Sequence, residues 1–359
     1  MVRRYQVAGL TFALDWPDDD PVWEHLHNYD PFVISACAPP LPGSQPPETS
    51  FGPHRCASLA LPPLTMPRAA RFNLRFSSLQ LGRDSELSLL SPAASVPEAA
   101  AASASEQAEL FRLQMVDQMP EVKRQPLYES PKESGEPVVG LWKIENGYFS
   151  EFRPHPGAPV CGQLEMRADF RYGCLYASGS VADRTFAVNN ALMLLYAFAS
   201  APFSALEMHA SVVMRGGRGF LFLGRSGTGK STHSNLWLKH IEGTELLNDD
   251  NPVLRIMDGE ARVYGTPWSG KTPCYKAQDV PVGAVVRLAQ APTNEISRLG
   301  AAAAYASVMA STSGFRPIRS LADAQHETIA AVALRVPCYH LNCLPDEAAA
   351  RLCCETVDG

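Results

Sequence analysis

The chain has 359 residues, with 31 basic and 37 acidic side chains and a formal net charge of −6. This length allows two domains with a sizeable core, and the acidic balance gives no basic field that would favour a nucleic-acid partner. Nine cysteines at irregular spacing, without a C-x-x-C pair, argue for reduced thiols in a cytoplasmic protein and against a zinc site.

No stretch of the sequence favours a membrane location. Arg3 and Arg4 are not followed by an apolar stretch of signal-peptide length. The longest apolar region, residues 191–201, is too short to cross a bilayer. We therefore expect no membrane and no nucleic-acid partner, while a homo-oligomer remains open.

The first third of the chain predicts strands separated by irregular segments. Residues 5–14 predict one strand, which the following prolines and aspartates end. Residues 72–76 alternate apolar and polar side chains and predict a half-buried strand. The region near 90–136 begins with a bias towards Ala, Ser and Pro, which predicts a flexible insertion. A helix over residues 105–119 is the alternative for part of it.

A hairpin, two strands and a helix follow. The apolar runs at residues 139–144 and 148–152 flank Asn-Gly, a strong hairpin signal, and short strands are expected at residues 164–170 and 174–177. Residues 185–199 have apolar side chains at helical spacing, which predicts a buried helix. We expect a β-rich α+β domain over residues 1–182 and an α/β domain over residues 183–359.

The stretch at residues 224–231 is the most informative in the chain. It reads GRSGTGKS and fits G-x-x-x-x-G-K-[ST], the phosphate-binding loop of nucleotide enzymes. The apolar run before it, residues 219–223, predicts a buried strand. The run from Lys230 to about residue 241 predicts a helix because it lacks Gly and Pro. This strand–loop–helix order is the context that the motif requires.

The residue types of this loop suit a nucleotide. Glycines let the backbone approach an anion without a Cβ in the way, and the N–H groups at a helix N-terminus then face the phosphates. Lys230 adds a positive charge near the β- and γ-phosphates, and the Ser231 hydroxyl can ligate Mg²⁺, with Mn²⁺ as the alternative. The sequence therefore predicts an ATP site formed by Gly224, Arg225, Ser226, Gly227, Thr228, Gly229, Lys230, Ser231 and Thr232.

Polar residues flank the loop on both sides in sequence. MHAS at residues 208–211 precedes the loop's strand, and LLNDDN at residues 246–251 follows its helix. Adjacent carboxylates repel each other, and a cation at a strand end would relieve the repulsion. One Asp can then hold Mg²⁺, while the other accepts the proton of an attacking hydroxyl.

Strands and helices are expected to complete the second domain. The strands are predicted at residues 252–257, 261–264, 282–288 and 338–341, and the helices at residues 301–311, at residues 321–334 and from Pro345 onwards.

The order MHASVV, GRSGTGKS and NDD resembles the P-loop fold shared by HPr serine kinase/phosphorylases and ATP-dependent phosphoenolpyruvate carboxykinases. In the first family the pattern reads roughly HG, GDSGxGKS, ADD, and in the second MHCS, GLSGTGKT, GDDE. The resemblance covers residues 205–279 well. It implies an α/β P-loop kinase domain of this type, preceded by a smaller β-rich α+β domain. It also implies transfer of the γ-phosphoryl group of ATP to a hydroxyl of a protein or peptide serine or of a small molecule.

The two families imply different roles for the same residues. By resemblance to the HPr kinases, His209 lies near the transferred phosphate and Asp250 is the catalytic base. Asp249 then supports the Mg²⁺ held by Ser231. By resemblance to the carboxykinases, His209 and Asp250 would instead ligate a divalent metal together.

A later segment resembles a loop that follows the double Asp in HPr-kinase-like proteins. It reads GTPWSGKTPCYK at residues 265–276. Lys271 and Lys276 supply cations where a transferring phosphoryl group needs its charge neutralised. Lys271 is therefore a further candidate catalytic residue.

Three functions compete on this sequence. A kinase acting on a hydroxyl fits best. A phosphoenolpyruvate carboxykinase-like enzyme is the alternative, but the chain is much shorter than members of that family and lacks their substrate-binding Arg and Tyr in matching context. A non-catalytic nucleotide-binding regulatory protein is the third, and the presence of His209, Lys230, Asp249 and Asp250 argues against it. The phosphoryl acceptor is not identified by the sequence.

Overall fold

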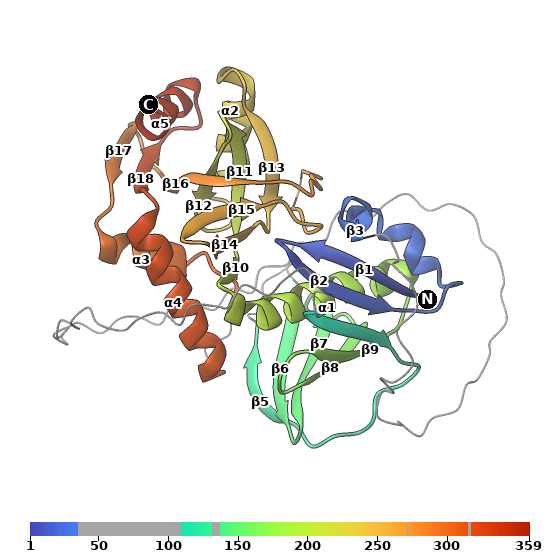
Figure 1. Cartoon of the computed structure of the whole chain (residues 1–359). Helices are drawn as coiled ribbons and strands as arrows, with labels where there is room; N and C mark the ends of the chain where they lie inside the picture. Colours follow the sequence, from blue (N-terminus) through green and yellow to red (C-terminus); the bar gives the residue numbers. More distant parts are fainter. Residues whose placement is uncertain (35–108, 131–136, 271, 315–316) are drawn as a thin grey trace.

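The computed structural model describes residues 1–34, 109–130, 137–270, 272–314 and 317–359, which form a mixed α/β protein with two large sheets (Figure 1). The mixed α/β class expected from the sequence is confirmed. The strand expected at residues 72–76, the Ala/Ser/Pro-biased start of the insertion and Lys271 lie outside the described residues.

Within the described residues, nine strands make up the first sheet: β1 (Val2–Val7), β2 (Leu10–Asp15), β3 (Val33–Ile34), β4 (Phe111–Met115), β5 (Gln125–Glu129), β6 (Val138–Ile144), β7 (Gly147–Arg153), β8 (Gly162–Arg167) and β9 (Tyr172–Ala177). They lie in the order β3-β1-β2-β4-β9-β8-β7-β6-β5. β4 is parallel to both of its neighbours, and the other neighbouring pairs are antiparallel. The hairpin expected around Asn-Gly is confirmed as β6 and β7, and the two strands expected after it are β8 and β9.

Two expectations for this sheet are wrong. The single strand expected at residues 5–14 is two strands, because Ala8 and Gly9 have φ of 50° and 73° and reverse the chain between β1 and β2. In place of the alternative helix, the described part of residues 105–119 holds β4. Phe111 and Leu113 are fully buried where β4 pairs between β2 and β9, so sheet pairing overrides the local helical tendency.

The helix α1 (Val181–Ser200) packs against the first sheet, on β8 and β9 (Figure 1). Ser180 and Asp183 form a capping box that fixes its start. By length and composition the segment Val181–Phe203 could cross a membrane, and 83% of its most apolar window is buried inside the protein. The domain boundary expected at residue 182 falls in the first turn of α1 and stays a prediction.

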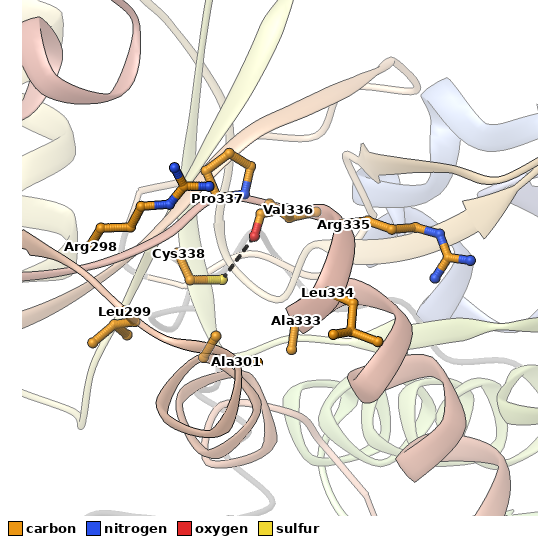
Figure 2. A pocket seen from close by; sticks show the side chains of 10 residues that line it. Arg298, Leu299, Ala301, Ala333, Leu334, Arg335, Val336, Pro337 and Cys338 are labelled. Carbon is orange, nitrogen blue, oxygen red and sulfur yellow. Dashed lines mark hydrogen bonds between the residues drawn. The ribbon is translucent and has the colours of Figure 1, made fainter. Parts of the chain in front are cut away.

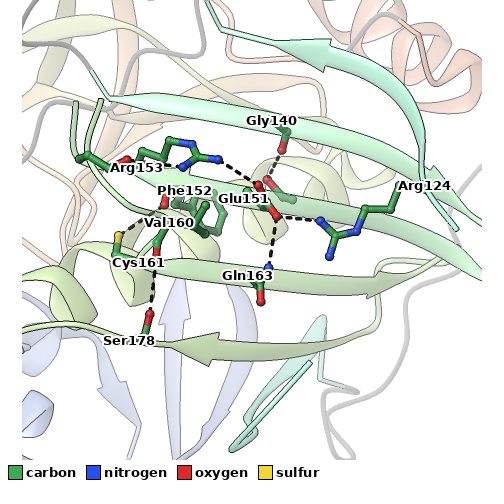
Figure 3. Close-up of polar contacts among 11 residues, drawn as sticks. Arg124, Gly140, Glu151, Phe152, Arg153, Val160, Cys161, Gln163 and Ser178 are labelled. Carbon is green, nitrogen blue, oxygen red and sulfur yellow. Dashed lines mark hydrogen bonds and ion pairs between the residues drawn. The ribbon is translucent and has the colours of Figure 1, made fainter. Parts of the chain in front are cut away.

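The other face of the first sheet carries a charged and aromatic network (Figure 3). The guanidinium of Arg124 lies 3.7 Å from the ring centroid of Phe149 and pairs with Glu151 at 2.7 Å. Gln163 Nε2 donates to the same carboxylate at 3.2 Å. Phe149 and Glu151 alternate along β7 with Phe152, which belongs to the core beneath α1, so they point away from that helix. Arg124, Glu151 and Gln163 on this face thus contact one another.

The second sheet, within the described residues, consists of β10 (Ala205–Glu207), β11 (Ala210–Arg215), β12 (Arg218–Leu223), β13 (Glu245–Asp250), β14 (Val253–Met257), β15 (Glu260–Tyr264), β16 (Asp279–Gln290), β17 (Glu295–Arg298) and β18 (Cys338–Cys343). Its helices are α2 (Lys230–His240), α3 (Ala301–Met309), α4 (Arg319–Arg335) and α5 (Glu347–Val357). The strands and helices expected from the sequence for this half of the chain are confirmed, with ends shifted by a few residues. β12, β16 and β18 are parallel neighbours, so their carboxyl ends share one edge.

Helices pack on both faces of these parallel strands. On one face, Phe222 of β12 packs in a core with Trp237 of α2 and Cys353 of α5. On the other face, Leu221 packs in a core with Val308 of α3 and with residues of α4. Like all seven cysteines in the described part of the chain, Cys353 is a free thiol.

Candidate active site

The loop at residues 224–229 joins β12 to α2, so the strand–loop–helix order expected from the sequence is confirmed. Gly227 and Gly229 have φ of 80° and 106°, a region that residues with a Cβ rarely adopt. A Cβ on Gly224 would lie 3.0 Å from the side chain of Thr228 across the turn. Gly229 is the N-cap of α2 and offers no side chain to cap it. The first N–H groups of α2 therefore remain available to an anion.

Lys230 joins the loop to His209. Its ammonium group donates to the carbonyl oxygen of Gly224 at 3.1 Å and lies 2.6 Å from Nε2 of His209. An ammonium group only donates, so Nε2 accepts and the ring proton is on Nδ1. Nδ1 lies 3.0 Å from Oδ1 of Asp250, which is ion-pair distance, but the angles are not those of a hydrogen bond. The imidazole thus stands between the loop lysine and one of the two carboxylates.

The other carboxylate belongs to the start of α2. Ser231 Oγ donates to Oδ1 of Asp249 at 2.9 Å, while Oδ2 of Asp249 is buried and has no hydrogen-bond partner among the described residues. A buried carboxylate oxygen beside a hydroxyl fits Mg²⁺, which prefers oxygen ligands and usually takes one or two carboxylates together with phosphate oxygens and water. Within the described residues, no three or more His, Cys, Asp and Glu side chains are grouped so that they could hold a metal on their own. A metal at this site would therefore also need phosphate oxygens or water as ligands.

The two adjacent Asp side chains serve different neighbours because side chains alternate along a strand. Asp249 faces α2 and Asp250 faces His209. Asp250 has a φ of 118°, an unfavourable backbone conformation for a residue with a Cβ. Gly270 packs directly against it, since a Cβ at Gly270 would lie 2.8 Å from the Cβ of Asp250. Backbone strain of this kind is concentrated at functional sites in proteins.

Buried hydrogen bonds hold the loop after β15 against the end of β13. Asn248 Nδ2 donates to the Trp268 carbonyl oxygen at 3.1 Å, and Thr266 Oγ1 donates to the Asn251 carbonyl oxygen at 2.7 Å. Ser269 Oγ donates to the Asp249 carbonyl oxygen at 3.1 Å. The polar residues around the double Asp therefore position this loop.

The expected role of the loop's lysines receives a correction. Lys276 does not face the site: its ammonium group pairs with Glu245 at 2.9 Å, at the opposite end of β13 from Asp250. Alternation along the chain could not reveal this, because the ion pair forms between segments that are distant in sequence. Lys271 lies outside the described residues, and its role stays a prediction.

The N-terminal region reaches the same loop. Trp268 Nε1 donates to the hydroxyl of Tyr29 at 2.9 Å, and that hydroxyl donates to Oδ1 of Asn189 at 3.1 Å. Asn28 Nδ2 donates to the Pro267 carbonyl oxygen at 2.8 Å. Burial raises the pKa of Tyr29 well above its ordinary value, so its hydroxyl stays protonated. The position of the loop beside Asp250 thus depends on residues from the first part of the chain.

Tyr29→Phe should lower the free energy of unfolding by about 1–3 kcal/mol, because it leaves the buried Trp268 Nε1 without an acceptor. Urea unfolding followed by circular dichroism measures the change. Tyr148→Phe is the matched control. The ring of Tyr148 stacks on the ring of Phe170 with 5.2 Å between the ring centroids, and its hydroxyl makes no hydrogen bond with the described residues. The control should stay within about 0.5 kcal/mol of the wild type. Equal losses in the two variants would contradict this role of Tyr29.

Two charged residues near the site were missed by the sequence reasoning. Glu207 precedes His209 by two residues, is 2% exposed, and has both carboxylate oxygens without a partner among the described residues. Burial, with a smaller contribution from the charge of Asp250, raises its pKa well above the ordinary value. Arg287 lies half-buried on β16. The sequence offered the same signal for Glu207 and for Arg287, because each is a charged residue inside an apolar run.

The predicted site residues meet at one edge of the second sheet. His209, Lys230, Ser231, Asp249 and Asp250 are linked by the contacts described above. The other residues expected at the ATP site lie on the loop or in the first turn of α2. Three of them are exposed, namely Arg225, Gly227 and Thr232. The rest are buried or half-buried, namely Gly224, Ser226, Thr228 and Gly229. Their contacts with a nucleotide remain predictions.

Comparisons with known proteins give no sequence match and a weak likeness to a solved structure. No family model matches the chain, and no curated protein matches it. Among solved structures, the chain is similar to the Hpr(Ser) kinase/phosphatase from Coxiella burnetii, with 14% sequence identity, 43% of this chain and 99% of that chain covered, and a TM-score of 0.25. A TM-score this low does not establish a shared fold.

Proposed function

We propose that this protein is a cytoplasmic ATP-dependent kinase, with a P-loop domain of the HPr kinase and phosphoenolpyruvate carboxykinase type after a β-rich N-terminal domain. One observation carries the proposal. Lys230 and Asp250 approach the same imidazole ring, at 2.6 Å from one nitrogen and 3.0 Å from the other. A cation suited to phosphates and a base suited to a hydroxyl therefore lie on either side of one imidazole ring, close enough to act on the same phosphoryl transfer.

Each residue of the site has a proposed task. The loop amides and Lys230 bind the phosphates of ATP, and Ser231 with Asp249 holds the metal. A bound Mg²⁺ supplies charge neutralisation for the phosphates. Asp250 accepts the proton of the attacking hydroxyl. His209 holds Asp250 and Lys230 in their relative positions through its two ring nitrogens.

The acceptor is proposed to be a hydroxyl of a protein or peptide serine or of a small molecule. Asp250 and His209 are partly exposed, with 13% and 17% of their side chains accessible, so an acceptor can reach the base without unfolding of the site. In support of this, Trp268 donates a hydrogen bond to Tyr29, which brings the N-terminal region to the loop beside Asp250. That region is therefore the proposed source of acceptor selectivity.

A carboxykinase-like enzyme is the second candidate. The observation in its favour is that His209 and Asp250 lie together, as a shared metal site in that family would require. The purified protein with ATP, Mn²⁺ and oxaloacetate should nevertheless form no phosphoenolpyruvate above the background of a Lys230→Ala variant. A coupled assay for phosphoenolpyruvate measures this. Robust formation would replace the kinase proposal with the carboxykinase.

The kinase proposal is tested by transfer of label. Wild-type protein, Mg²⁺ and γ-labelled ATP are incubated with heat-treated cell extract, in which endogenous kinases are inactive. A labelled protein, peptide or metabolite should appear, and it should be absent with Lys230→Ala. Hydrolysis of ATP without any labelled acceptor would favour a nucleotide-dependent regulatory protein instead.

A further inference from the structure

Arg287 is a cation within the otherwise apolar middle of β16. It pairs in register with Leu223, the last residue of β12, so it lies beside the start of the phosphate-binding loop. Three residues further along β16, Gln290 Nε2 donates to the carbonyl oxygen of Gly227 at 3.2 Å. The carboxyl end of β16 therefore runs alongside the phosphate-binding loop, and Arg287 is the charged residue of β16 that lies beside the loop.

No acidic side chain balances Arg287 within the described part of the chain. Its guanidinium makes one long hydrogen bond, 3.4 Å to the carbonyl oxygen of Ser307. None of the described carboxylates lies within ion-pair distance of Arg287 or of Arg225 in the loop. By contrast, Arg184 and Arg262 each pair with a carboxylate.

This arrangement is costly without a ligand. Burial, and then the neighbouring charge of Arg225, lower the pKa of Arg287. Removing a guanidinium from water without a counter-charge costs free energy, and repulsion between two like charges adds to that cost. An anion between the two arginines would offset both contributions.

Arg287 approaches the sheet edge from the side opposite to α2. It alternates along β16 with Val286 and Leu288, which pack in the core under α2 and α5, so its side chain points to the α3 side, where Ser307 lies. Lys230 and the free amides of α2 come from the other side. An anion at this edge would thus be held from both sides.

We propose that Arg287 and Arg225 form an anion subsite beside the phosphate-binding loop that takes a phosphate group, either the γ-phosphate of ATP or a phosphate on the acceptor. A guanidinium presents paired N–H donors that match two phosphate oxygens. If the subsite binds the γ-phosphate of ATP, the inference rests on the proposed kinase function. If the subsite binds a phosphate of the acceptor, the inference deepens that function, because the phosphoryl acceptor would then be a molecule that already carries a phosphate group.

Calorimetric titration of Arg287→Gln tests the subsite with three probes: ATP–Mg²⁺, ADP–Mg²⁺, and inorganic phosphate in the presence of saturating ADP–Mg²⁺. Arg335→Gln is the matched control. Arg335 also makes one long hydrogen bond to a backbone carbonyl, 3.3 Å to Ala331, and it lies among the residues that line a cavity of about 200 Å³ at the start of β18, at the other end of that strand from the edge that carries the phosphate-binding loop (Figure 2). Arg225→Gln should change affinities in the same direction as Arg287→Gln.

The probes separate the sources of the phosphate. If the subsite takes the γ-phosphate, Arg287→Gln weakens ATP binding by about 10–100-fold and ADP binding by less than about 3-fold. If it takes an acceptor phosphate, both nucleotides bind as in the wild type and phosphate binding falls by at least about 10-fold. Unchanged affinities for all three probes would overturn the subsite. If the wild type binds no nucleotide, the kinase proposal fails, and phosphate binding alone then decides the subsite.

Discussion

Lys230→Ala is expected to leave a folded protein whose phosphoryl transfer is reduced by at least about 10²–10³-fold, the usual effect of removing one preorganised donor from a charged transition state. Lys230 is buried at the start of α2 and its ammonium group lies between Gly224 and His209. Alanine removes the cation that contacts the loop backbone at Gly224. ATP–Mg²⁺ binding should weaken as well, because the same charge contacts the phosphates before transfer.

The fold should survive this substitution because α2 is held by other residues. Trp237 of α2 is fully buried and packs with Phe220 and Phe222 of β12. Lys239→Ala is the control on the same helix, since Lys239 is exposed in its last turn. Circular dichroism should show the same folded spectrum for both variants, with normal transfer only in the control. A folded Lys230→Ala protein with the wild-type rate would show that the loop is not a phosphate-binding loop.

The elements around the loop were predictable because their signals are local. Glycines at positive φ, an apolar strand and an uninterrupted helical run occur within about twenty residues, and each constrains the backbone without help from distant parts of the chain. The same is true of the Asn-Gly turn between β6 and β7. The strand order was not predictable in this way: the structure brings Asp249 and Asp250 to the loop because they end a strand two positions from the loop strand in the sheet.

The remaining features depend on contacts between distant segments. Residues 111–115 became a strand because β2 and β9 bury them from both sides. Lys276 forms an ion pair with Glu245 and so does not face the site. The contact of Tyr29 with Trp268 joins residues 239 positions apart, and no local pattern encodes it. Arg287 and Glu207 stood out only as charges in apolar runs, and their meaning came from their neighbours in space.

Asp250→Asn is expected to reduce phosphoryl transfer by about 10²–10⁴-fold, the usual share of general acid–base catalysis, while ATP–Mg²⁺ affinity stays near the wild-type value. Asn keeps the shape of the side chain and tolerates the φ of 118° at this position about as well as Asp. Its carbonyl oxygen can still face Nδ1 of His209. The substitution therefore removes little except the ability to take a proton.

Asp249→Asn is the matched variant because it changes the neighbouring carboxylate in the same way. Asp249 accepts from Ser231 and has a buried oxygen without a described partner, so its charge is proposed to serve the metal. Its loss should weaken metal binding, and raising Mg²⁺ or Mn²⁺ should restore part of the rate. A proton acceptor lost at Asp250 cannot be restored by metal.

A titration of metal against rate for both variants distinguishes the two assignments. Rescue of Asp249→Asn together with a metal-independent defect in Asp250→Asn supports Asp250 as the base and Asp249 as the metal ligand. The opposite result, rescue at Asp250 and none at Asp249, would reverse the assignment. His209 and Asp250 would then be the residues that hold the metal. The site would in that case follow the carboxykinase arrangement, even if the acceptor is a hydroxyl.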